Sequence, residues 1–263
     1  MGYNTRRYWN NKEKRAEKAR EHTQLMDYYY GDEIDDCVNE TKIYNEKSDF
    51  NTELNGLNNI IIDDLDSVSA IFKYSNKNNI NAVLNFASYK NPGGMFINGS
   101  IAQEEYLCHY SYLYNVLKKF DNNYYKWNRE HKNKALYLNR ALYSPNVRFE
   151  NGSNYIYCDV LTCASPNKKA SQKYCYVSDE ENFKVLKERI EFILKVAQDN
   201  LVENLILGAI GCGVFGQSPY EVAQIFKELL TTKYKCFDKV IFAIPDKNGE
   251  NYIAFKEVLK DVI

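Results

Sequence analysis

Short apolar runs alternate with amphipathic segments along most of the chain. Runs of three to six apolar residues fit buried strands, and apolar residues three and four positions apart fit helices with one buried face. The predicted strands are Ile60–Ile62, Ala82–Ala87, Tyr155–Cys163, Leu205–Ile210 and Val240–Ile244. The predicted helices are Leu65–Lys77, Gln103–Phe120, Glu181–Asp199, Pro219–Leu230 and Tyr252–Val262.

Strands that alternate with helices in this way are typical of an α/β protein, with a mixed, mostly parallel sheet between layers of helices. In such sheets ligands bind beyond the carboxyl ends of the strands, where loops meet helix N-termini. Two loops with unusual composition are predicted there, Ser88–Ala102 and Gly211–Ser218.

The N-terminal part differs from the rest because it is charged and helix-prone from Thr5 to about Tyr30. Ala16, Ala19 and Met26 are its core-facing positions, and Gly31 with the acidic cluster after it is expected to end the helix. We expect residues 1–50 to form a helical extension packed on a main domain of residues 51–263.

Composition is that of an ordinary globular protein: 263 residues, 44% hydrophobic, with 34 Lys and Arg against 35 Asp and Glu. The net charge of −1 argues against nucleic-acid binding by bulk electrostatics, and no sequence-specific nucleic-acid partner is expected. No apolar run approaches the ~18 residues of a membrane span. The polar N-terminus does not resemble a secretory signal, so we expect a cytoplasmic protein.

Seven cysteines form an odd set without a Cys-x-x-Cys pair. With this pattern we expect neither a disulfide framework nor a structural zinc site. We expect reduced thiols in or near the core. Neither a metal nor a cofactor is expected.

The second loop reads Gly211-Cys212-Gly213-Val214-Phe215-Gly216 and leads into a helix opened by Ser218-Pro219. Three glycines let backbone N–H groups converge, and the helix N-terminus favours an anion, so a diphosphate fits there. The string also matches Gly-x-Gly-x-x-Gly, but too little chain follows for a dinucleotide-binding half, and no acidic residue ends the next strand. A structural turn is the other alternative.

The first loop contains Asn91-Pro92-Gly93-Gly94, followed by Met95. Seven further residues, Phe96–Ala102, lead to a helix that opens with Gln103-Glu104-Glu105. Neighbouring helical side chains diverge by roughly 100°, so the two carboxyl groups are expected to do different work. One can hold sugar hydroxyls while the other reaches a scissile bond. The alternative is that both acidic residues only suit the dipole of the first helical turn.

Together the two motifs resemble the bacterial-type poly(ADP-ribose) glycohydrolases, whose signature is Gly-Gly-Gly, a short spacer and Gln-Glu-Glu. The similar strings are NFASYKNPGG with QEEYL, and LGAIGCGVFGQSP about 100 residues later. The resemblance covers roughly residues 55–260. It implies a three-layer macrodomain-like fold and hydrolysis of ribose–ribose bonds in poly(ADP-ribose), with ADP-ribose and the polymer on modified proteins as ligands.

The resemblance also implies roles for individual residues. Glu105 corresponds to the catalytic acid, and Glu104 to the residue that hydrogen-bonds the ribose at the cleaved bond. Phe215 is expected to pack against the terminal ribose. The other implied ADP-ribose contacts are Asn91, Gly93, Gly94, Gln103, Gly211, Cys212, Gly213, Val214 and Gly216.

One position departs from the signature, because Met95 replaces the third glycine. A side chain here can crowd the diphosphate or require a different backbone angle. Two alternative functions follow from this departure, a macrodomain that binds ADP-ribose without cleaving it and a hydrolase that removes single ADP-ribose units. Asp64, after the first strand, is expected to cap the following helix, with an adenine contact as the alternative.

Overall fold

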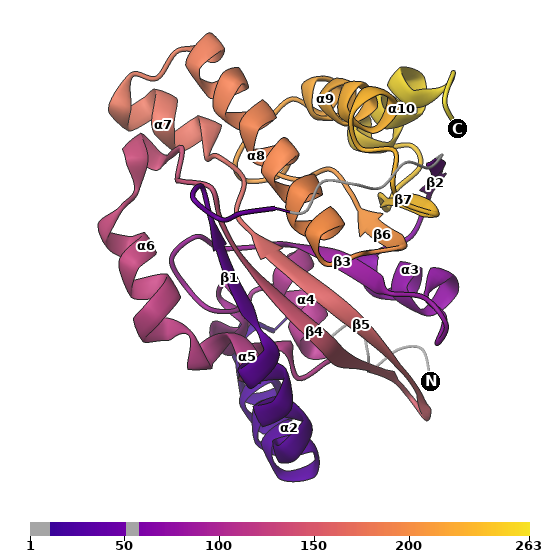
Figure 1. The fold of residues 1–263 in the computed structure, drawn as a ribbon. Helices are drawn as coiled ribbons and strands as arrows, with labels where there is room; N and C mark the ends of the chain where they lie inside the picture. The colour runs from indigo at the N-terminus through magenta and orange to yellow at the C-terminus, as the bar shows by residue number, and fades with distance from the viewer. Residues whose placement is uncertain (1–10, 51–57) are drawn as a thin grey trace.

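The computed structural model describes residues 11–50 and 58–263, and a seven-stranded sheet runs through its centre (Figure 1). Its strand order is β1-β4-β5-β3-β6-β7-β2. Only β4 is antiparallel to its neighbours β1 and β5, so the predicted mixed, mostly parallel sheet is confirmed. The strands are β1 Lys42–Asn45, β2 Asn59–Asp63, β3 Asn81–Phe86, β4 Arg140–Asn151, β5 Asn154–Cys163, β6 Asn204–Leu207 and β7 Lys239–Ala243.

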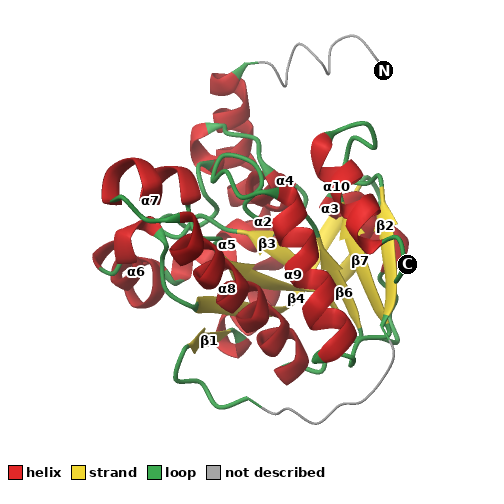
Figure 2. Ribbon diagram, turned by 90° about the horizontal axis from the view of Figure 1, so that it is seen from above, coloured by secondary structure: helices red, strands yellow, loops and turns green. Residues whose placement is uncertain are grey.

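Helices cover both faces of the sheet (Figure 1 and Figure 2). The α-helices are α2 Lys12–Glu40, α3 Ser67–Tyr74, α4 Gln103–His109, α5 Leu113–Lys119, α6 Lys126–Glu130, α7 Lys168–Cys175, α8 Asp179–Asp199, α9 Pro219–Thr232 and α10 Glu250–Leu259. Three single turns, η1 Phe96–Asn98, η2 Asp121–Tyr125 and η3 Asn133–Ala135, complete the described helical structure.

Two separate apolar cores follow from the alternation of side chains along the strands. In β3, Ala82 and Leu84 face the core under α8, α9 and α10, whereas Val83 faces the core under α2, α3, α4 and α5. Because both faces are buried, β3 is apolar at four of its six positions, and its two polar residues, Asn81 and Asn85, are buried as well. The result is a three-layer α/β fold.

The N-terminal helix is longer than the sequence predicts. Gly31 does not end it: α2 continues to Glu40, with non-helical angles only at Tyr30 (φ −129°, ψ 26°). Ile34 and Cys37, beyond this kink, are buried in the core under α2, and this packing outweighs the poor helix propensity of glycine. Residues 5–10 of the predicted helix lie outside the described residues. The predicted domain boundary, after residue 50, falls where the first described range ends.

The predicted single helix Gln103–Phe120 is two helices, α4 and α5. Ser111 lies at the break, where its hydroxyl donates to the Leu107 carbonyl oxygen (2.8 Å) and accepts from the Leu113 N–H (3.1 Å). A serine that satisfies both helix ends in this way makes the break favourable, although the apolar periodicity runs on across it.

Four elements were not predicted: β1, β4, α6 and α7. Strand β4 pairs with β5 along most of its length, and β1 pairs with β4, so both depend on partners distant in sequence. The prediction of free cysteines is confirmed, since all seven are unpaired. Within the described residues, no helix is long and apolar enough to cross a membrane.

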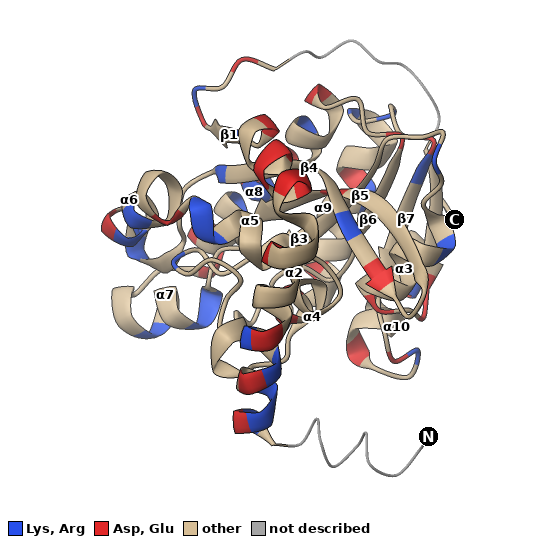
Figure 3. Ribbon diagram, turned by 90° about the horizontal axis from the view of Figure 1, so that it is seen from below, with Lys and Arg blue, Asp and Glu red and all other residues tan. Residues whose placement is uncertain are grey.

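Charged side chains of both signs alternate along α2, whereas α7 carries three lysines and no acidic residue (Figure 3). Because α7 follows the end of β5, its lysines lie on the side of the sheet where ligands are expected.

Candidate active site

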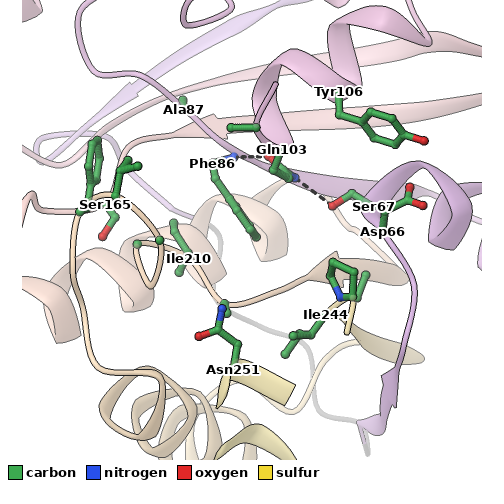
Figure 4. A pocket seen from close by; sticks show the side chains of 18 of the residues that line it. Asp66, Ser67, Phe86, Ala87, Gln103, Tyr106, Ser165, Ile210, Ile244 and Asn251 are labelled. Carbon is green, nitrogen blue, oxygen red and sulfur yellow. Dashed lines mark hydrogen bonds between the residues drawn. The ribbon is translucent and has the colours of Figure 1, made fainter. Parts of the chain in front are cut away.

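A cavity of about 640 Å³ opens at the carboxyl ends of the parallel strands (Figure 4). Phe86 ends β3, Ala243 ends β7, and Ala209 and Ile210 follow β6, and all four line the cavity. This is the place at which α/β sheets bind ligands, as the sequence analysis expects.

Both predicted loops contribute to this cavity. Ile101, Ala102 and Gln103 form one part of its wall, and the glycine-rich loop of residues 211–216 forms another. Of the predicted site residues, Gln103, Gly211, Gly213, Val214 and Phe215 line the cavity. The remaining ones, Asn91, Gly93, Gly94, Glu104, Glu105, Cys212 and Gly216, lie outside its lining.

The glycine-rich loop is fixed at both ends by its own backbone. The Gly216 N–H donates to the Gly213 carbonyl (3.1 Å), and the Gln217 N–H donates to the Gly211 carbonyl (3.0 Å). Gly211 and Gly216 have φ angles of +78° and +75°, which side chains disfavour. A Cβ on Gly211 would also overlap the Ser165 hydroxyl.

The buried Gln217 amide anchors the loop from behind. It exchanges two hydrogen bonds with the Asn182 amide (2.9 and 3.0 Å) and donates a third to the Pro166 carbonyl (2.9 Å). No described residue accepts a hydrogen bond from the N–H groups of Gly213, Val214 and Phe215. Three consecutive unpaired donors in a rigid loop are suited to an anionic ligand.

The aromatic ring of Phe215 is held in place by other rings. It lies 6.2 Å from Tyr137, and Tyr137 stacks on Tyr89 with ring centroids 4.2 Å apart. Cys212 is a poor nucleophile, because burial raises the pKa of its thiol to about 12.

The first loop folds tightly around Gly93 and Gly94, which have φ angles of +62° and +60°. A Cβ on Gly94 would lie 2.5 Å from Glu105 Oε1 and 2.9 Å from Glu104 Oε2. The two carboxyl groups therefore converge under this glycine, although they leave the helix in different directions. Asn91 is exposed, and its carbonyl accepts the Gly94 N–H (3.1 Å).

Glu105 is buried, with 6% of its surface exposed, and its carboxylate is held by backbone donors on two sides. The Met95 N–H donates to Oε1 and the Ala102 N–H donates to Oε2, both at 2.9 Å. Because Ala102 itself lines the cavity, the Glu105 carboxylate lies behind a wall of the cavity that the glycine-rich loop also lines.

Glu104 is also buried, and its surroundings differ. Oε2 accepts the Ser88 N–H at 2.7 Å, and Oε1 accepts the Asn85 amide at 3.3 Å. Burial, with a smaller contribution from the negative charge of Glu105, raises the pKa of Glu104 to about 8, although the hydrogen bonds from the Ser88 N–H and the Asn85 amide lower it.

Met95 needs no glycine-like backbone, because its φ angle is −114° and its ψ angle is 31°. Its side chain is 44% exposed. The replacement of the third glycine therefore leaves the backbone of the loop unstrained.

The Gln103 amide is fully used within the protein. Oε1 accepts the Phe86 N–H (2.8 Å), and Nε2 donates to the Ser67 hydroxyl (3.0 Å; Figure 4). Nε2 also donates to the Leu84 carbonyl (2.8 Å). These bonds join the start of α4 to the end of β3 and the start of α3, so Gln103 positions Glu104 and Glu105.

Several cavity residues were not predicted. The N-cap of α3 is Asp66 and not Asp64, because the helix starts two residues later than the sequence predicts, and Asp66 lines the cavity. Other residues that line the cavity and were missed are Ser67, Tyr106, Ser165 and Asn251. Their position just after a strand or in the first turn of a helix was the available signal for all four.

A metal site is not evident in the described ranges, which hold no group of three His, Cys, Asp or Glu side chains able to bind an ion. The described polar features closest to catalytic chemistry are the buried carboxyl pair behind the cavity wall and the N–H groups of residues 213–215, which have no described acceptor.

Solved structures similar to this chain are poly(ADP-ribose) glycohydrolases. One from Thermomonospora curvata has 26% identity and a TM-score of 0.83, covering 93% of this chain and 98% of the other. A second T. curvata structure, bound to the inhibitor ADP-HPD, has 25% identity and a TM-score of 0.78, covering 92% and 98%. A Deinococcus radiodurans T267R mutant in complex with ADP-ribose has 27% identity and a TM-score of 0.78, covering 88% and 98%.

No curated protein matches the sequence. The sequence profile of the microbial-type poly(ADP-ribose) glycohydrolase catalytic domain matches residues 10–150, more than half of the 263 residues. The chain therefore belongs to the microbial-type poly(ADP-ribose) glycohydrolase family.

Proposed function

We propose that this protein hydrolyses the ribose–ribose O-glycosidic bonds of poly(ADP-ribose) and releases ADP-ribose, with Glu105 as general acid and base. One observation carries this proposal: a buried carboxylate is fixed behind one wall of a cavity, and the loop that faces it offers three unpaired N–H groups. Family membership and the similar structures, one with ADP-ribose and one with an inhibitor, support it.

The ligand is proposed to bind across both loops. Its diphosphate accepts hydrogen bonds from the N–H groups of residues 213–215, while Phe215 packs against the terminal ribose. Gly93 and Gly94 allow the distal ribose to approach the carboxyl pair, and Asn91 contacts the same sugar. Gly211, Cys212 and Gly216 shape the loop around the phosphates, and Gln103 supports the sugar from the cavity wall.

Cleavage proceeds through an oxocarbenium-like transition state. Glu105 donates a proton to the oxygen of the departing ribose hydroxyl as the bond between that oxygen and the anomeric carbon breaks. Water then attacks the anomeric carbon and returns a proton to Glu105. Glu104 holds a hydroxyl of the ribose at the cleaved bond.

We further propose that residues 51–263 form the catalytic domain and residues 1–50 an extension that supports it. Strand β1, within the extension, pairs with β4 and so joins the two parts in one sheet. Unpaired cysteines fit a reducing cytoplasm, where modified proteins carrying the polymer would be the substrates.

The test is chromatography of free ADP-ribose released from defined poly(ADP-ribose), with wild type beside Glu105→Gln. We expect the substitution to lower kcat by about 10²- to 10⁴-fold, because it removes general acid–base catalysis. Affinity for ADP-ribose should change by less than about threefold, because the side chain keeps its shape. Glu13→Gln, in the exposed first turn of α2, is the matched control and should leave both unchanged.

Two outcomes would contradict the proposal. Tight ADP-ribose binding without release from any substrate would make the protein a binding module. Release from mono-modified protein but not from polymer would make it a mono-ADP-ribosyl hydrolase.

A further inference from the structure

Asn85 is the last buried residue of β3, one position before the strand ends, and it has no exposed surface. Its Nδ2 lies 3.3 Å from Glu104 Oε1 and 3.3 Å from the Thr162 hydroxyl, both long for a hydrogen bond. Its Oδ1 is buried and has no donor among the described residues. A buried carbonyl oxygen without a partner is unfavourable, so this orientation of the amide leaves it poorly satisfied.

The surroundings of Glu104 do not suit a negative charge. No described Lys, Arg or His forms an ion pair with it, and the carboxylate of Glu105 lies on the same helix, converging with it under Gly94. The other titratable groups near this site are the Tyr125 phenol and the Cys108 thiol. Burial, and then the charge of Glu104, raise the pKa values of both well above their ordinary range, so both stay neutral. A buried carboxylate without a counter-ion, beside a second carboxylate, costs several kcal/mol although the Ser88 N–H bonds it, so a neutral carboxyl is favoured.

A neutral Glu104 needs an acceptor for its O–H, and the NH₂ of Asn85 cannot serve. The two ends of an asparagine amide have the same shape, so a half-turn brings Oδ1 to Glu104 Oε1. The Thr162 hydroxyl can donate as well as accept, and it therefore bonds Asn85 in either orientation. After the turn, Oδ1 accepts from Glu104 and from Thr162, and the NH₂ group takes the position in which Oδ1 had no donor.

We propose that Asn85 is a positioning residue that turns its carbonyl oxygen to Glu104 and holds a proton on that side chain. Glu104 then works as a neutral carboxylic acid, and Glu105 is the one member of the pair that exchanges a proton. The proton on Glu104 Oε1 stays there throughout the reaction. Oε2, which faces Gly94, accepts the ribose hydroxyl without adding a second negative charge beside Glu105 and the diphosphate.

The role in the reaction rests on the proposed function, but the position of the proton does not. Infrared spectroscopy of the folded protein therefore tests it without a substrate. At about pH 6, the infrared spectrum of wild type minus that of Glu104→Gln should show the carbonyl band of a protonated carboxyl group. This band should disappear with a midpoint near 8, in line with the pKa of Glu104. A spectrum without that band at about pH 6 would overturn the proposal.

Asn85→Leu tests the acceptor. The carbonyl band of Glu104 should persist but move, because its O–H has lost its partner. Asn115→Leu is the matched control, since Asn115 is also fully buried with an unpartnered Oδ1, and its Nδ2 donates to Thr23. It should leave the band unchanged. An identical band in Asn85→Leu and wild type would refute the role of Asn85.

Kinetics separate positioning from simple loss of structure. Asn85→Leu should lower kcat on the polymer by on the order of tenfold, because Glu104 is no longer held in place. Affinity for ADP-ribose should stay within about twofold. If Asn85→Leu does not fold, nuclear magnetic resonance of the wild type replaces it. The side-chain amide resonances of Asn85 should then shift over the same pH range in which the infrared band disappears. Resonances that do not shift would contradict the proposal. Absence of polymer hydrolysis by wild type would contradict the proposed function, but it would not affect the infrared evidence for a proton on Glu104.

Discussion

Lys169 shows how one side chain can complete a site that its sequence position does not reveal. Its backbone N–H donates to the Phe215 carbonyl (3.1 Å), and its side chain lies across Gly216, where a Cβ would meet Cγ at 2.6 Å. None of the residues that line the cavity is a Lys or Arg, and Lys169 forms no ion pair with a described carboxylate. Its ammonium group is therefore available to the diphosphate that we propose to bind at the glycine-rich loop.

We predict that Lys169→Met raises Kd for ADP-ribose by about tenfold, because the ammonium group is lost while the packing on Gly216 is kept. Titration calorimetry at two salt concentrations measures this, and the salt dependence should weaken in the variant. Lys173→Met, on the same helix and over the Tyr174 ring, is the control and should bind as wild type does. Equal affinity of Lys169→Met and wild type would exclude Lys169 from the site.

Helix α2 supports the first loop through contacts that cross a long sequence distance. The Arg15 guanidinium donates to the Gly99 carbonyl (2.7 Å), and Arg20 donates to the Ile97 carbonyl (3.4 Å). Gly99 lies so close to α2 that a Cβ would overlap the Lys12 carbonyl oxygen. The helix therefore packs on η1, which follows Met95, and holds the loop whose N–H bonds Glu105.

Gly99→Ala should lower both stability and kcat, because it strains a backbone with φ +77° and pushes α2 away from η1. We expect a loss of about 2–4 kcal/mol in the free energy of unfolding, measured in urea. Gly152→Ala, in the β4–β5 turn, has φ +65° and open space around its Cβ, so it isolates the backbone strain. A loss no larger than that of Gly152→Ala would show that α2 does not support the loop.

Elements were predictable where the signal is local. Apolar runs as in β3 and helical periodicity as in α8 predict their structures directly, because burial on both faces or on one face requires those patterns. The continuation of α2 past Gly31 and the pairing of β4 depend on distant contacts, which a local pattern does not carry. The break at Ser111 is local, but the apolar periodicity that continues across it predicts one helix.

At the scale of the whole molecule, sheet topology brings the two loops to one cavity. The sequence predicts both loops at carboxyl ends of strands, and β3 and β6 are neighbours in the sheet, so the loops meet. The sequence did not predict that Gln103 would be used within the protein, or that Lys169 would lie on the loop. Both follow from contacts between elements far apart in the chain.

The buried Glu104 links the site to the stability of the whole fold. Its pKa is about 8 in the folded protein and near 4.5 in the unfolded chain. At a pH between these two pKa values, Glu104 has lost its proton in the unfolded chain but keeps it in the folded protein. The stability from Glu104 is therefore fully present below about pH 4.5, falls as the pH rises and is lost above about pH 8.

Glu104→Gln removes this dependence. We predict that the free energy of unfolding of wild type, relative to the variant, decreases by a few kcal/mol between about pH 5 and about pH 8. Urea unfolding of both proteins across this range measures it. A constant difference would mean that Glu104 titrates at its ordinary pKa.

The most direct test of the account is a crystal structure of Glu105→Gln with ADP-ribose. We predict that the diphosphate accepts hydrogen bonds from the N–H groups of residues 213–215, and that the anomeric carbon of the distal ribose lies beside the side chain at position 105. ADP-ribose bound elsewhere, such as in the cavity lined by Lys42, Asn81 and Asp159, or bound with the distal ribose turned away from position 105, would contradict it.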